Sequence, residues 1–390
     1  MTRAAHLIVT GGTGYIGAAL VARALREGRT VTLLGRRPGP VGTHHVTWAL
    51  GDRFPAHIPG QQAALVHLAH DWQASGQDSI AATARLFDGA RTAGIATRVF
   101  ISSQSAREHA LNRYGRLKWA TEQRIGDATS LRVGLVYGGT LTAMYGLLAK
   151  LATLPLLPMI EPHRTVQPIH LDEVVDGILA AADGQAGGVR ALAGPQQVAF
   201  GDVLRLLARQ YRGRRLPIIP VPLSLALFAC DMTARLPLIP TVDRERVLGL
   251  AGTEPIDSAA DLAALGVAVR PMGERLAREP AGRRALLAEG RAFLRHAGIA
   301  PTPALLRRYA RAWPEGAIAR PRLPLRWCEP LGSDTPLGRR LRVAARIAEA
   351  SAPGEAALAA GSRIARLARL AAHGAYDALC LPLRLVLGRA

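Results

Sequence analysis

Cysteine is scarce in this chain of 390 residues, which contains only three. Cys230, Cys328 and Cys380 lie far apart, and this spacing excludes a disulfide framework and a cysteine-based metal site. We therefore expect a reducing, cytoplasmic compartment and no bound metal. Long apolar runs are also missing, since none reaches the ~18 residues of a membrane-spanning helix. The N-terminus leaves no room for a signal peptide before the first predicted strand.

Lysine is rare compared with arginine. Of the 49 basic residues, only Lys118 and Lys150 are lysines. A lysine retained in so arginine-rich a chain suggests a role that the planar guanidinium cannot fill. Lys118 follows Tyr114 by four residues, so a helix would place both side chains on one face. The ammonium would favour the phenolate and lower the pKa of Tyr114 from about 10. A surface helix that carries an unrelated tyrosine and lysine is the alternative.

Glycine, in contrast, is concentrated in the segment TGGTGYIG, residues 10–17. The segment lies between an apolar run and an amphipathic run, which is the order strand, glycine turn, helix. Glycine permits a tight turn, a close approach of a pyrophosphate and close packing of helix against sheet, while the helix N-terminus attracts the phosphates. The cofactor-binding residues predicted here are Thr10, Gly11, Gly14, Tyr15, Ile16 and Gly17.

Strands and helices are predicted to alternate through the first half of the chain. Residues 30–34, 64–68 and 98–102 have the apolar character of buried strands, and residues 79–93 and 112–125 are predicted helices. This alternation predicts an α/β fold with a Rossmann-type doubly wound parallel sheet. Helices and proline-rich loops after residue 139 predict a small substrate lobe. We expect a mainly nucleotide-binding domain at 1–165, the remaining sheet elements and lobe at 166–268, and a basic helical extension at 269–390.

These motifs together resemble the short-chain dehydrogenase/reductase superfamily, in its extended or atypical branch of NAD-dependent epimerase/dehydratase-like proteins. The glycine segment matches the TGxxGxxG loop, and Tyr114 with Lys118 matches the YxxxK pair. Phe100–Ser103 matches the strand that ends in the catalytic serine, with Ser103 as the counterpart. The resemblance covers about residues 5–265 and includes two further family segments, LRVGLVYG at 131–138 and PIHLDEV at 168–174.

The resemblance implies an enzyme that acts on a small-molecule substrate. Tyr114 would be the general acid/base, Lys118 would hold the cofactor ribose, and Ser103 would bind the reacting oxygen. An NAD(P)H-dependent oxidoreductase or an epimerase/dehydratase would use such a site at a carbinol or carbonyl carbon. Only eleven positions separate Ser103 from Tyr114, which makes the chain similar to the NAD(P)H-binding accessory subunit of respiratory complex I. A non-catalytic NADPH-binding assembly or sensor protein is therefore the alternative.

The cofactor's identity is suggested by the end of the second predicted strand. NAD-preferring enzymes place an acidic residue there, whereas this chain has Gly35 followed by Arg36 and Arg37. Two guanidinium groups suit a 2′-phosphate, so we expect NADPH to be preferred and NAD to be the second choice. The alternative is that both arginines merely reflect the arginine-rich composition.

Several other polar residues admit two interpretations. Asp52 resembles the family's adenine-contacting aspartate and would serve equally as a turn residue. Ala69 would lie near the nicotinamide, and His67 and His70 on either side of it are expected to be core or loop histidines. Asp172 is expected to be the N-cap of the helix that follows it.

Residues 270–390 carry 22 arginines and nine acidic residues, a net +13 of the chain's +20. Arginine recurs every third residue in SRIARLARL at 362–370. Such a basic amphipathic stretch is typical of segments that bind an anionic membrane surface, here the inner face, or an acidic protein. A solvated helical bundle is the alternative. Nucleic acid is not expected, because no binding motif occurs and aromatic residues make up 5%. The sequence does not reveal the substrate, the reaction direction or the oligomeric state.

Overall fold

The computed structural model describes the first 70% of the chain almost continuously and little of the rest. The described residues are 3–55, 58, 60, 62–70, 75–212, 215–234 and 244–278, with 291, 300, 302–303, 306, 368, 371–372 and 375. The predicted basic extension at 269–390 therefore lies mainly outside the described residues. Within the described residues, no helix combines the length and the apolar character needed to cross a membrane.

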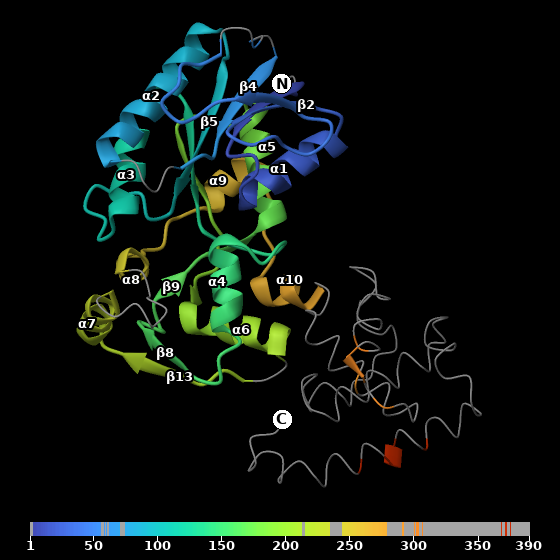
Figure 1. Cartoon of the computed structure of the whole chain (residues 1–390), viewed down its shortest axis with the longest axis vertical. Helices are drawn as coiled ribbons and strands as arrows, with labels where there is room; N and C mark the ends of the chain where they lie inside the picture. The colour runs from blue at the N-terminus through green and yellow to red at the C-terminus, as the bar shows by residue number, and fades with distance from the viewer. Residues whose placement is uncertain are drawn as a thin grey trace. The chain divides into compact units, whose positions relative to one another are not determined.

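A seven-stranded sheet is the centre of the fold (Figure 1). All its neighbouring strands pair in parallel. Their order across the sheet is β11 (Val189–Leu192), β6 (Thr129–Val133), β5 (Thr97–Ser103), β4 (Ala63–His67), β1 (His6–Thr10), β2 (Thr30–Gly35) and β3 (His44–Thr47). The predicted parallel, doubly wound Rossmann-type sheet is thus confirmed.

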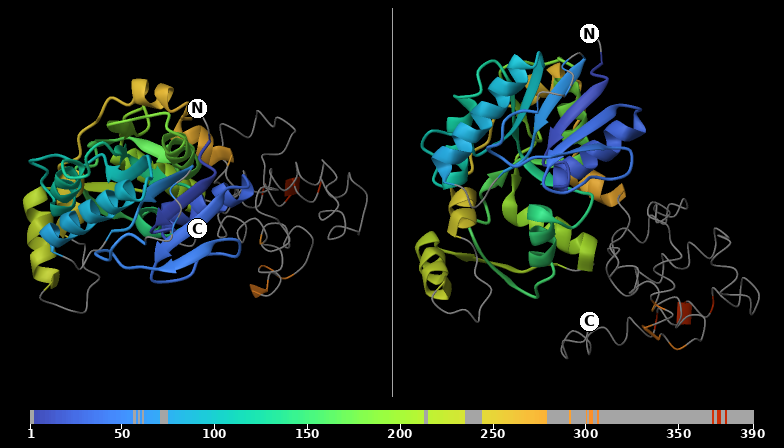
Figure 2. Two further views of the ribbon diagram at one scale, coloured as in Figure 1. Left: turned by 90° about the horizontal axis from the view of Figure 1, so that it is seen from above. Right: turned by 45° about the horizontal axis from the view of Figure 1, so that its top comes forward.

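Helices cover both faces of this sheet (Figure 2). The α-helices are α1 (Tyr15–Arg26), α2 (Gly76–Thr92), α3 (Arg113–Glu122), α4 (Ala143–Leu151), α5 (Leu171–Ala182), α6 (Phe200–Arg212), α7 (Leu223–Ala234), α8 (Arg244–Ala251), α9 (Ala259–Ala264) and α10 (Met272–Arg278). Short two-stranded pairs join β7 (Leu135–Tyr137) to β10 (Pro168–His170), β9 (Thr165–Val166) to β12 (Val198–Ala199), and β8 (Leu157–Ile160) to β13 (Ile218–Val221).

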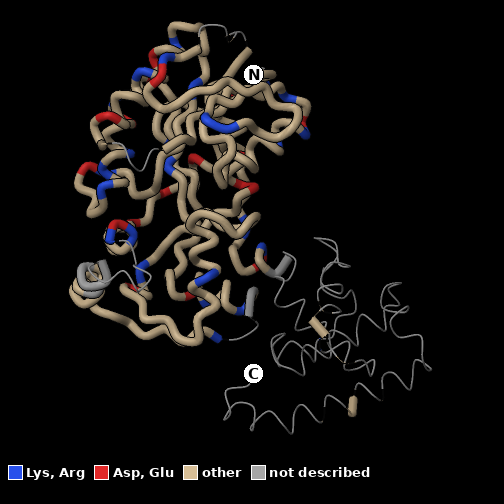
Figure 3. Tube along the Cα trace, in the orientation of Figure 1, with Lys and Arg blue, Asp and Glu red and all other residues tan. Residues whose placement is uncertain are grey.

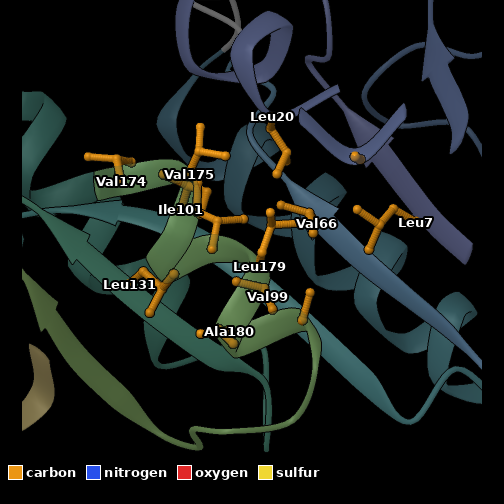
Figure 4. Close-up of a cluster of buried hydrophobic side chains, with 14 of the residues drawn as sticks. Leu7, Leu20, Val66, Val99, Ile101, Leu131, Val174, Val175, Leu179 and Ala180 are labelled. Carbon is orange, nitrogen blue, oxygen red and sulfur yellow. The ribbon is translucent and has the colours of Figure 1, made fainter. Parts of the chain in front are cut away.

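The core explains why the strands are apolar without alternation. Parallel strands covered on both faces bury every side chain, and all five residues of β4 are buried. On one face, α1 and α5 contribute residues such as Leu20 and Leu179, which pack against Val66 and Val99 of the strands (Figure 4). On the other face, α2 contributes Leu86, Phe87 and Ala90, which pack with Leu65 and Phe100.

The order of the strands creates a switch point beside β1. The chain passes from β1 to β2 and β3 on one side, and then returns to β4, β5, β6 and β11 on the other. In sheets of this kind ligands bind outside the carboxyl ends of the strands, where the order reverses. The residues that follow β1 and β4 meet at this point, and they include the glycine segment and Ala69.

The chain divides into two compact units. The first contains residues 1–147, 158–203 and 218–272, and therefore the whole sheet and every predicted site residue; the second contains residues 148–157, 204–217 and 273–390. In the second unit, the amide of Leu157 donates to the carbonyl of Pro217 at 3.0 Å. Both units are discontinuous in sequence, and the boundaries expected at residues 165 and 268 stay a prediction.

Charged residues of both signs occur close together on the outer helices, as Figure 3 shows. Arg23 pairs with Glu27 at the end of α1 at 2.6 Å, and Arg91 pairs with Asp88 on α2 at 3.1 Å. Residues 1–269 have a net charge of only +7, so the chain's large positive charge comes mainly from residues outside the described part.

Candidate active site

The turn between β1 and α1 packs so closely against neighbouring backbone that Gly11 and Gly17 leave no room for a side chain. Gly11 has a φ of +69°, which favours glycine, and a β-carbon there would lie 2.8 Å from the amide nitrogen of Ala69. A β-carbon on Gly17 would lie 2.2 Å from the carbonyl oxygen of Gly11. The two glycines thus permit the approach of the β4 loop and of helix α1, as the spacing predicted.

The N-terminus of α1 is open to an anion. Gly14 is the N-cap and provides no side-chain cap, and the first turn contains no acidic residue. The amides of such a turn, with the positive end of the helix dipole, form an anion-binding site. Beside this turn, Tyr15 donates to the carbonyl of Gly138 at 2.5 Å and stacks on Tyr145. Ile16 packs against the main apolar core.

Thr10 joins the ends of β1 and β4. Its Oγ1 lies 2.7 Å from Nδ1 of His67 and accepts the amide of Ala69 at 3.2 Å. His67 is fully buried against the rings of Phe87 and Phe100. Burial, and secondarily Lys118 and His70, lower the pKa of His67 to about 3. His67 is therefore a neutral core histidine, in agreement with the sequence interpretation.

Helix α3 carries the predicted proton carrier and its lysine partner. Asn112 caps the helix by accepting the amide of Gly115 through Oδ1 at 3.3 Å. Tyr114 and Lys118 lie one turn apart, and Nζ of Lys118 is 5.7 Å from the centroid of the Tyr114 ring. The same nitrogen donates to the carbonyl of Ile101 on β5 at 2.7 Å. The structure thus brings both side chains beside the end of β5.

The two serines at the end of β5 have different partners. Ser102 is buried, and its hydroxyl donates to Oε1 of Glu122 at 2.6 Å. Ser103 is partly buried, and its Oγ lies 2.9 Å from Oγ of Ser105. Ser103 Oγ also accepts the amide of Ser105 at 3.2 Å, and its role towards a substrate oxygen stays a prediction.

The electrostatics of Tyr114 differ from the sequence expectation. Burial raises the pKa of Tyr114 to about 12, and the expected lowering by Lys118 is not found. Burial also lowers the pKa of Lys118 to about 8, against the opposing effect of Glu122. The ammonium lies 4.5 Å from the centroid of the Phe100 ring and bonds to a main-chain carbonyl, so it is directed at β5 as well as at the phenol. His70 contacts the Tyr114 ring edge-on at 5.2 Å.

The residues predicted to bind the nucleotide's adenosine half lie at the ends of β2 and β3. Arg36 and Arg37 are exposed and directly follow Gly35, the last residue of β2. Asp52 closes a turn, because its Oδ2 accepts the amide of Ala49 at 2.7 Å and its own amide donates to the Ala49 carbonyl at 3.0 Å. The turn interpretation of Asp52 is therefore correct, and its adenine contact stays a prediction.

One capping prediction is wrong. The N-cap of α5 is His170, whose Nδ1 accepts the amide of Asp172 at 3.2 Å. Glu173 completes a capping box by accepting the amide of His170 at 2.9 Å. Asp172 is the second residue of the helix, because the chain turns helical at Leu171 rather than after the aspartate.

Sequence reasoning missed the ion pair between Glu122 of α3 and Arg132 of β6. Glu122 has no exposed side-chain surface and accepts from Arg132 of β6, with an Nη2–Oε2 distance of 2.6 Å. The spacing along α3 indicates only that Glu122 shares a helix face with Lys118, four residues earlier, and gives no sign of Arg132 as its partner. Among the described residues, no group of three or more His, Cys, Asp and Glu side chains is placed to hold a metal ion.

Comparison with known proteins finds a family likeness in the first part of the chain. Residues 7–109 match the model of the NAD dependent epimerase/dehydratase family. The match covers 103 of the 390 residues, about a quarter of the chain. The match covers β1, the glycine segment and β5, and it ends before Tyr114 and Lys118. No curated protein matches the chain.

Solved structures share the fold of this chain at low sequence identity. MoeE5 in complex with UDP-glucuronic acid and NAD has a TM-score of 0.54 at 20% identity, over 70% of this chain and 96% of that chain. UDP-N-acetylglucosamine 4-epimerase from Bacillus cereus has a TM-score of 0.50 at 17% identity, over 68% of this chain and 94% of that chain. An Agrobacterium tumefaciens short-chain dehydrogenase/reductase superfamily protein with bound NAD has a TM-score of 0.50 at 20% identity, over 70% and 94%.

These structures are similar to this chain in fold. None of the three is a subunit of respiratory complex I, and that part of the sequence resemblance stays a prediction. Identities of 20% or less carry the fold and no substrate.

Proposed function

We propose that this chain is an NAD(P)-dependent oxidoreductase or epimerase/dehydratase that acts at a carbinol or carbonyl carbon of a small molecule. The observation that carries the proposal is the position of Tyr114 and Lys118 on one face of α3. Nζ of Lys118 lies 5.7 Å from the Tyr114 ring centroid and is fixed to β5, the strand that ends in Ser103. A proton carrier, a cation and a hydroxyl donor therefore lie around the carboxyl end of one central strand.

The residues present fit a dinucleotide. Gly11 and Gly17 let the turn pack closely against neighbouring backbone, where a β-carbon would collide, and the uncapped first turn of α1 offers amides to a pyrophosphate. Lys118 would bond to the nicotinamide ribose, and Thr10 and Ala69 would line the nearby switch point. When bound, the nicotinamide would donate or accept a hydride.

The proposed preference for NADPH is supported by the end of β2. Gly35 provides no carboxylate for a ribose 2′-hydroxyl, and the exposed Arg36 and Arg37 follow it directly. Two guanidinium groups at that position suit the additional phosphate of NADPH, because charge-assisted bonds to phosphate are strong.

The protein's own residues would handle the proton. Burial raises the pKa of Tyr114 to about 12, which keeps its phenol protonated at neutral pH. A protonated phenol is the form that a general acid needs, so this arrangement favours reduction of a carbonyl group. Ser103 would donate to the same carbonyl oxygen and orient it towards the Tyr114 hydroxyl.

A second candidate is a non-catalytic NADPH-binding assembly or sensor protein. The observation that favours it is also the raised pKa of Tyr114, because an unusually weak acid is a poor catalyst in either direction. In this reading Lys118 has a structural role, in which it joins α3 to the Ile101 carbonyl.

The turnover and the NADPH binding of the Tyr114→Phe variant distinguish the enzyme from the non-catalytic binding protein. Nucleotide affinity is measured by calorimetry, and NADPH oxidation is followed with a panel of ketones, aldehydes and keto-sugar nucleotides. We expect the wild type to oxidise NADPH with at least one substrate. Tyr114→Phe should bind NADPH with unchanged affinity and lose about 100-fold or more of the turnover, the usual contribution of a general acid. Full turnover by Tyr114→Phe, or nucleotide binding without any turnover by the wild type, would overturn the enzyme proposal.

A further inference from the structure

Glu122, the last residue of α3, is a buried carboxylate one turn after Lys118. Its side chain has 0% exposure. Oε1 accepts the hydroxyl of Ser102 at 2.6 Å and Nε of Arg132 at 3.0 Å, and Oε2 accepts Nη2 of Arg132 at 2.6 Å. A carboxylate so far from solvent requires such partners, because an unpaired buried charge is strongly destabilising.

The two partners of Glu122 are themselves neighbours in the sheet. Ser102 of β5 and Arg132 of β6 are opposite each other in the parallel ladder. Glu122 therefore fastens the end of α3 to two adjacent strands at once. One turn earlier on the helix, Lys118 donates to the carbonyl of Ile101, the residue before Ser102. Successive turns of α3 are thus joined to successive residues of β5.

This register bears directly on the proposed catalytic residues. Ser103 is the next residue of β5 after these two attachment points, and Tyr114 is one turn of α3 before Lys118. The separation between Ser103 and Tyr114 therefore depends on how α3 is held against β5. Within the described part of the chain, the side chains of Glu122 and Lys118 hydrogen-bond α3 to that strand.

The charges around Lys118 come from several elements. Tyr114 and Glu122 interact with it from α3, and His67 interacts with it from β4. His70, from the segment after β4, contacts the Tyr114 ring. Tyr114 is a phenol with a raised pKa and His67 is neutral, since its pKa is about 3. Arg132 adds a positive charge from β6, and this charge is directed at Glu122. Glu122 is thus the negative group that opposes the effect of burial on Lys118.

We propose that Glu122 is a positioning residue for Lys118. Its carboxylate, held by Ser102 and Arg132, keeps the buried Lys118 side chain in its ammonium form and at a fixed place beside Tyr114. The value of this ammonium to catalysis rests on the proposed function. The action of Glu122 on Lys118 is a separate physical effect that can be measured without turnover.

The chain's lysine content makes the measurement direct. Lys118 and Lys150 are the only two lysines, and Lys150 is exposed on α4. In the full-length Lys150→Arg background, isotope-labelled lysine gives a single side-chain NMR signal, which belongs to Lys118. We expect the signal to titrate with a midpoint near 8. Adding Glu122→Gln should lower this midpoint by about one unit, the low end of what a nearby opposite charge contributes.

Two matched variants distinguish the loss of the Glu122 charge from a general loosening of the structure around Lys118. Arg132→Gln keeps the negative charge of Glu122, so it should not lower the midpoint. Ser102→Ala removes one hydrogen bond to the carboxylate but no charge, so it should change the midpoint much less than Glu122→Gln does. If Glu122→Gln does not fold, the double variant Glu122→Gln, Arg132→Gln removes both buried charges together and should still lower the midpoint, by less than the loss of the carboxylate alone.

An unchanged Lys118 midpoint in folded Glu122→Gln would overturn the inference, as would equal decreases in Glu122→Gln and Arg132→Gln. Neither result depends on the enzyme proposal. Conversely, if Tyr114→Phe retains full turnover while the Lys118 midpoint falls as expected in Glu122→Gln, the proposed function fails and the effect of Glu122 on Lys118 stands.

Discussion

Gly17 of α1 lies directly against the carbonyl oxygen of Gly11, so closely that a β-carbon on Gly17 would be 2.2 Å from that oxygen. The contact is between backbone and backbone, and no side-chain rotation can relieve it. Helix α1 can therefore approach the end of β1 only while residue 17 is glycine. This approach directs the first turn of α1 at the switch point where the nucleotide is proposed to bind.

Gly17→Ala is expected to destabilise the protein and to weaken nucleotide binding. Overpacking of this kind costs about 1–3 kcal/mol, and the displaced helix would no longer present its amides. Chemical denaturation and calorimetric titration with NADPH measure the two effects. Gly187→Ala is the matched control, because a β-carbon there meets nothing within 4 Å. Equal stability of the two variants would contradict the prediction.

The double variant Arg36→Ala, Arg37→Ala is expected to bind NADPH about 10-fold or more weakly, a loss of ~1.4 kcal/mol. Its affinity for NADH should change little, because NADH lacks the phosphate that the guanidinium groups would contact. Arg26→Ala, Arg124→Ala removes the same charge from exposed positions distant in sequence from the end of β2 and serves as the control. Equal affinities of the wild type for NADPH and NADH would rule out the preference.

Lys118→Arg is expected to reduce turnover by about 100-fold or more, because a planar fork cannot replace a compact donor. The Lys118 nitrogen fits between the Ile101 carbonyl, at 2.7 Å, and the Phe100 ring, with its centroid at 4.5 Å. The larger group should also cost about 1–3 kcal/mol of stability. Lys150→Arg, at an exposed position, should be silent in both assays. Wild-type turnover by Lys118→Arg would show that the ammonium is dispensable.

His67 is expected to make the fold sensitive to acid. Its pKa is about 3 in the folded protein and 6.5 in its reference state, so below pH 6.5 the unfolded chain binds a proton that the folded chain does not. Stability should therefore fall as pH decreases from 6.5 towards 3, by up to about 1.4 kcal/mol per pH unit from this group. Above pH 6.5 His67 is neutral in both the folded and the unfolded chain, so it no longer makes stability depend on pH.

Denaturation at a series of pH values checks the acid sensitivity. His67→Asn should lose stability at every pH, because it gives up packing against Phe87 and Phe100, yet its stability should decrease less steeply on acidification. His109→Asn, at an exposed position, should retain the wild-type slope. An identical slope in wild type and His67→Asn would refute the assignment.

Much of the fold could be predicted because its signals are local. Apolar runs marked β2, β4 and β5, and the helix predicted at 79–93 is α2, which begins slightly earlier at Gly76 because Ser75 provides the N-cap. The glycine spacing also carries its own physical reason, since Gly11 and Gly17 occupy places where a β-carbon would collide with backbone.

The rest depends on contacts that a sequence pattern does not contain. The pKa of Tyr114 is set by burial, which spacing along a helix does not reveal. The partners of Glu122 come from two strands whose register becomes known only with the sheet. The role of His170 as N-cap requires the extended backbone at the end of β10. The adsorption of the basic region at 269–390 to an anionic surface stays a prediction, because that region lies mainly outside the described residues.

The bond between Lys118 and the Ile101 carbonyl has a consequence for folding. Strand β5 pairs with β4 on one side and β6 on the other, and both pairings are parallel, so each closes a long stretch of chain. Parallel pairings of this kind form slowly. Residues 97–118 hold Ser103, Tyr114 and Lys118, but a nascent chain that ends before β6 lacks one of the two strands that flank β5. We therefore expect the proposed catalytic groups to come into register late, so that turnover would report only the fully folded protein.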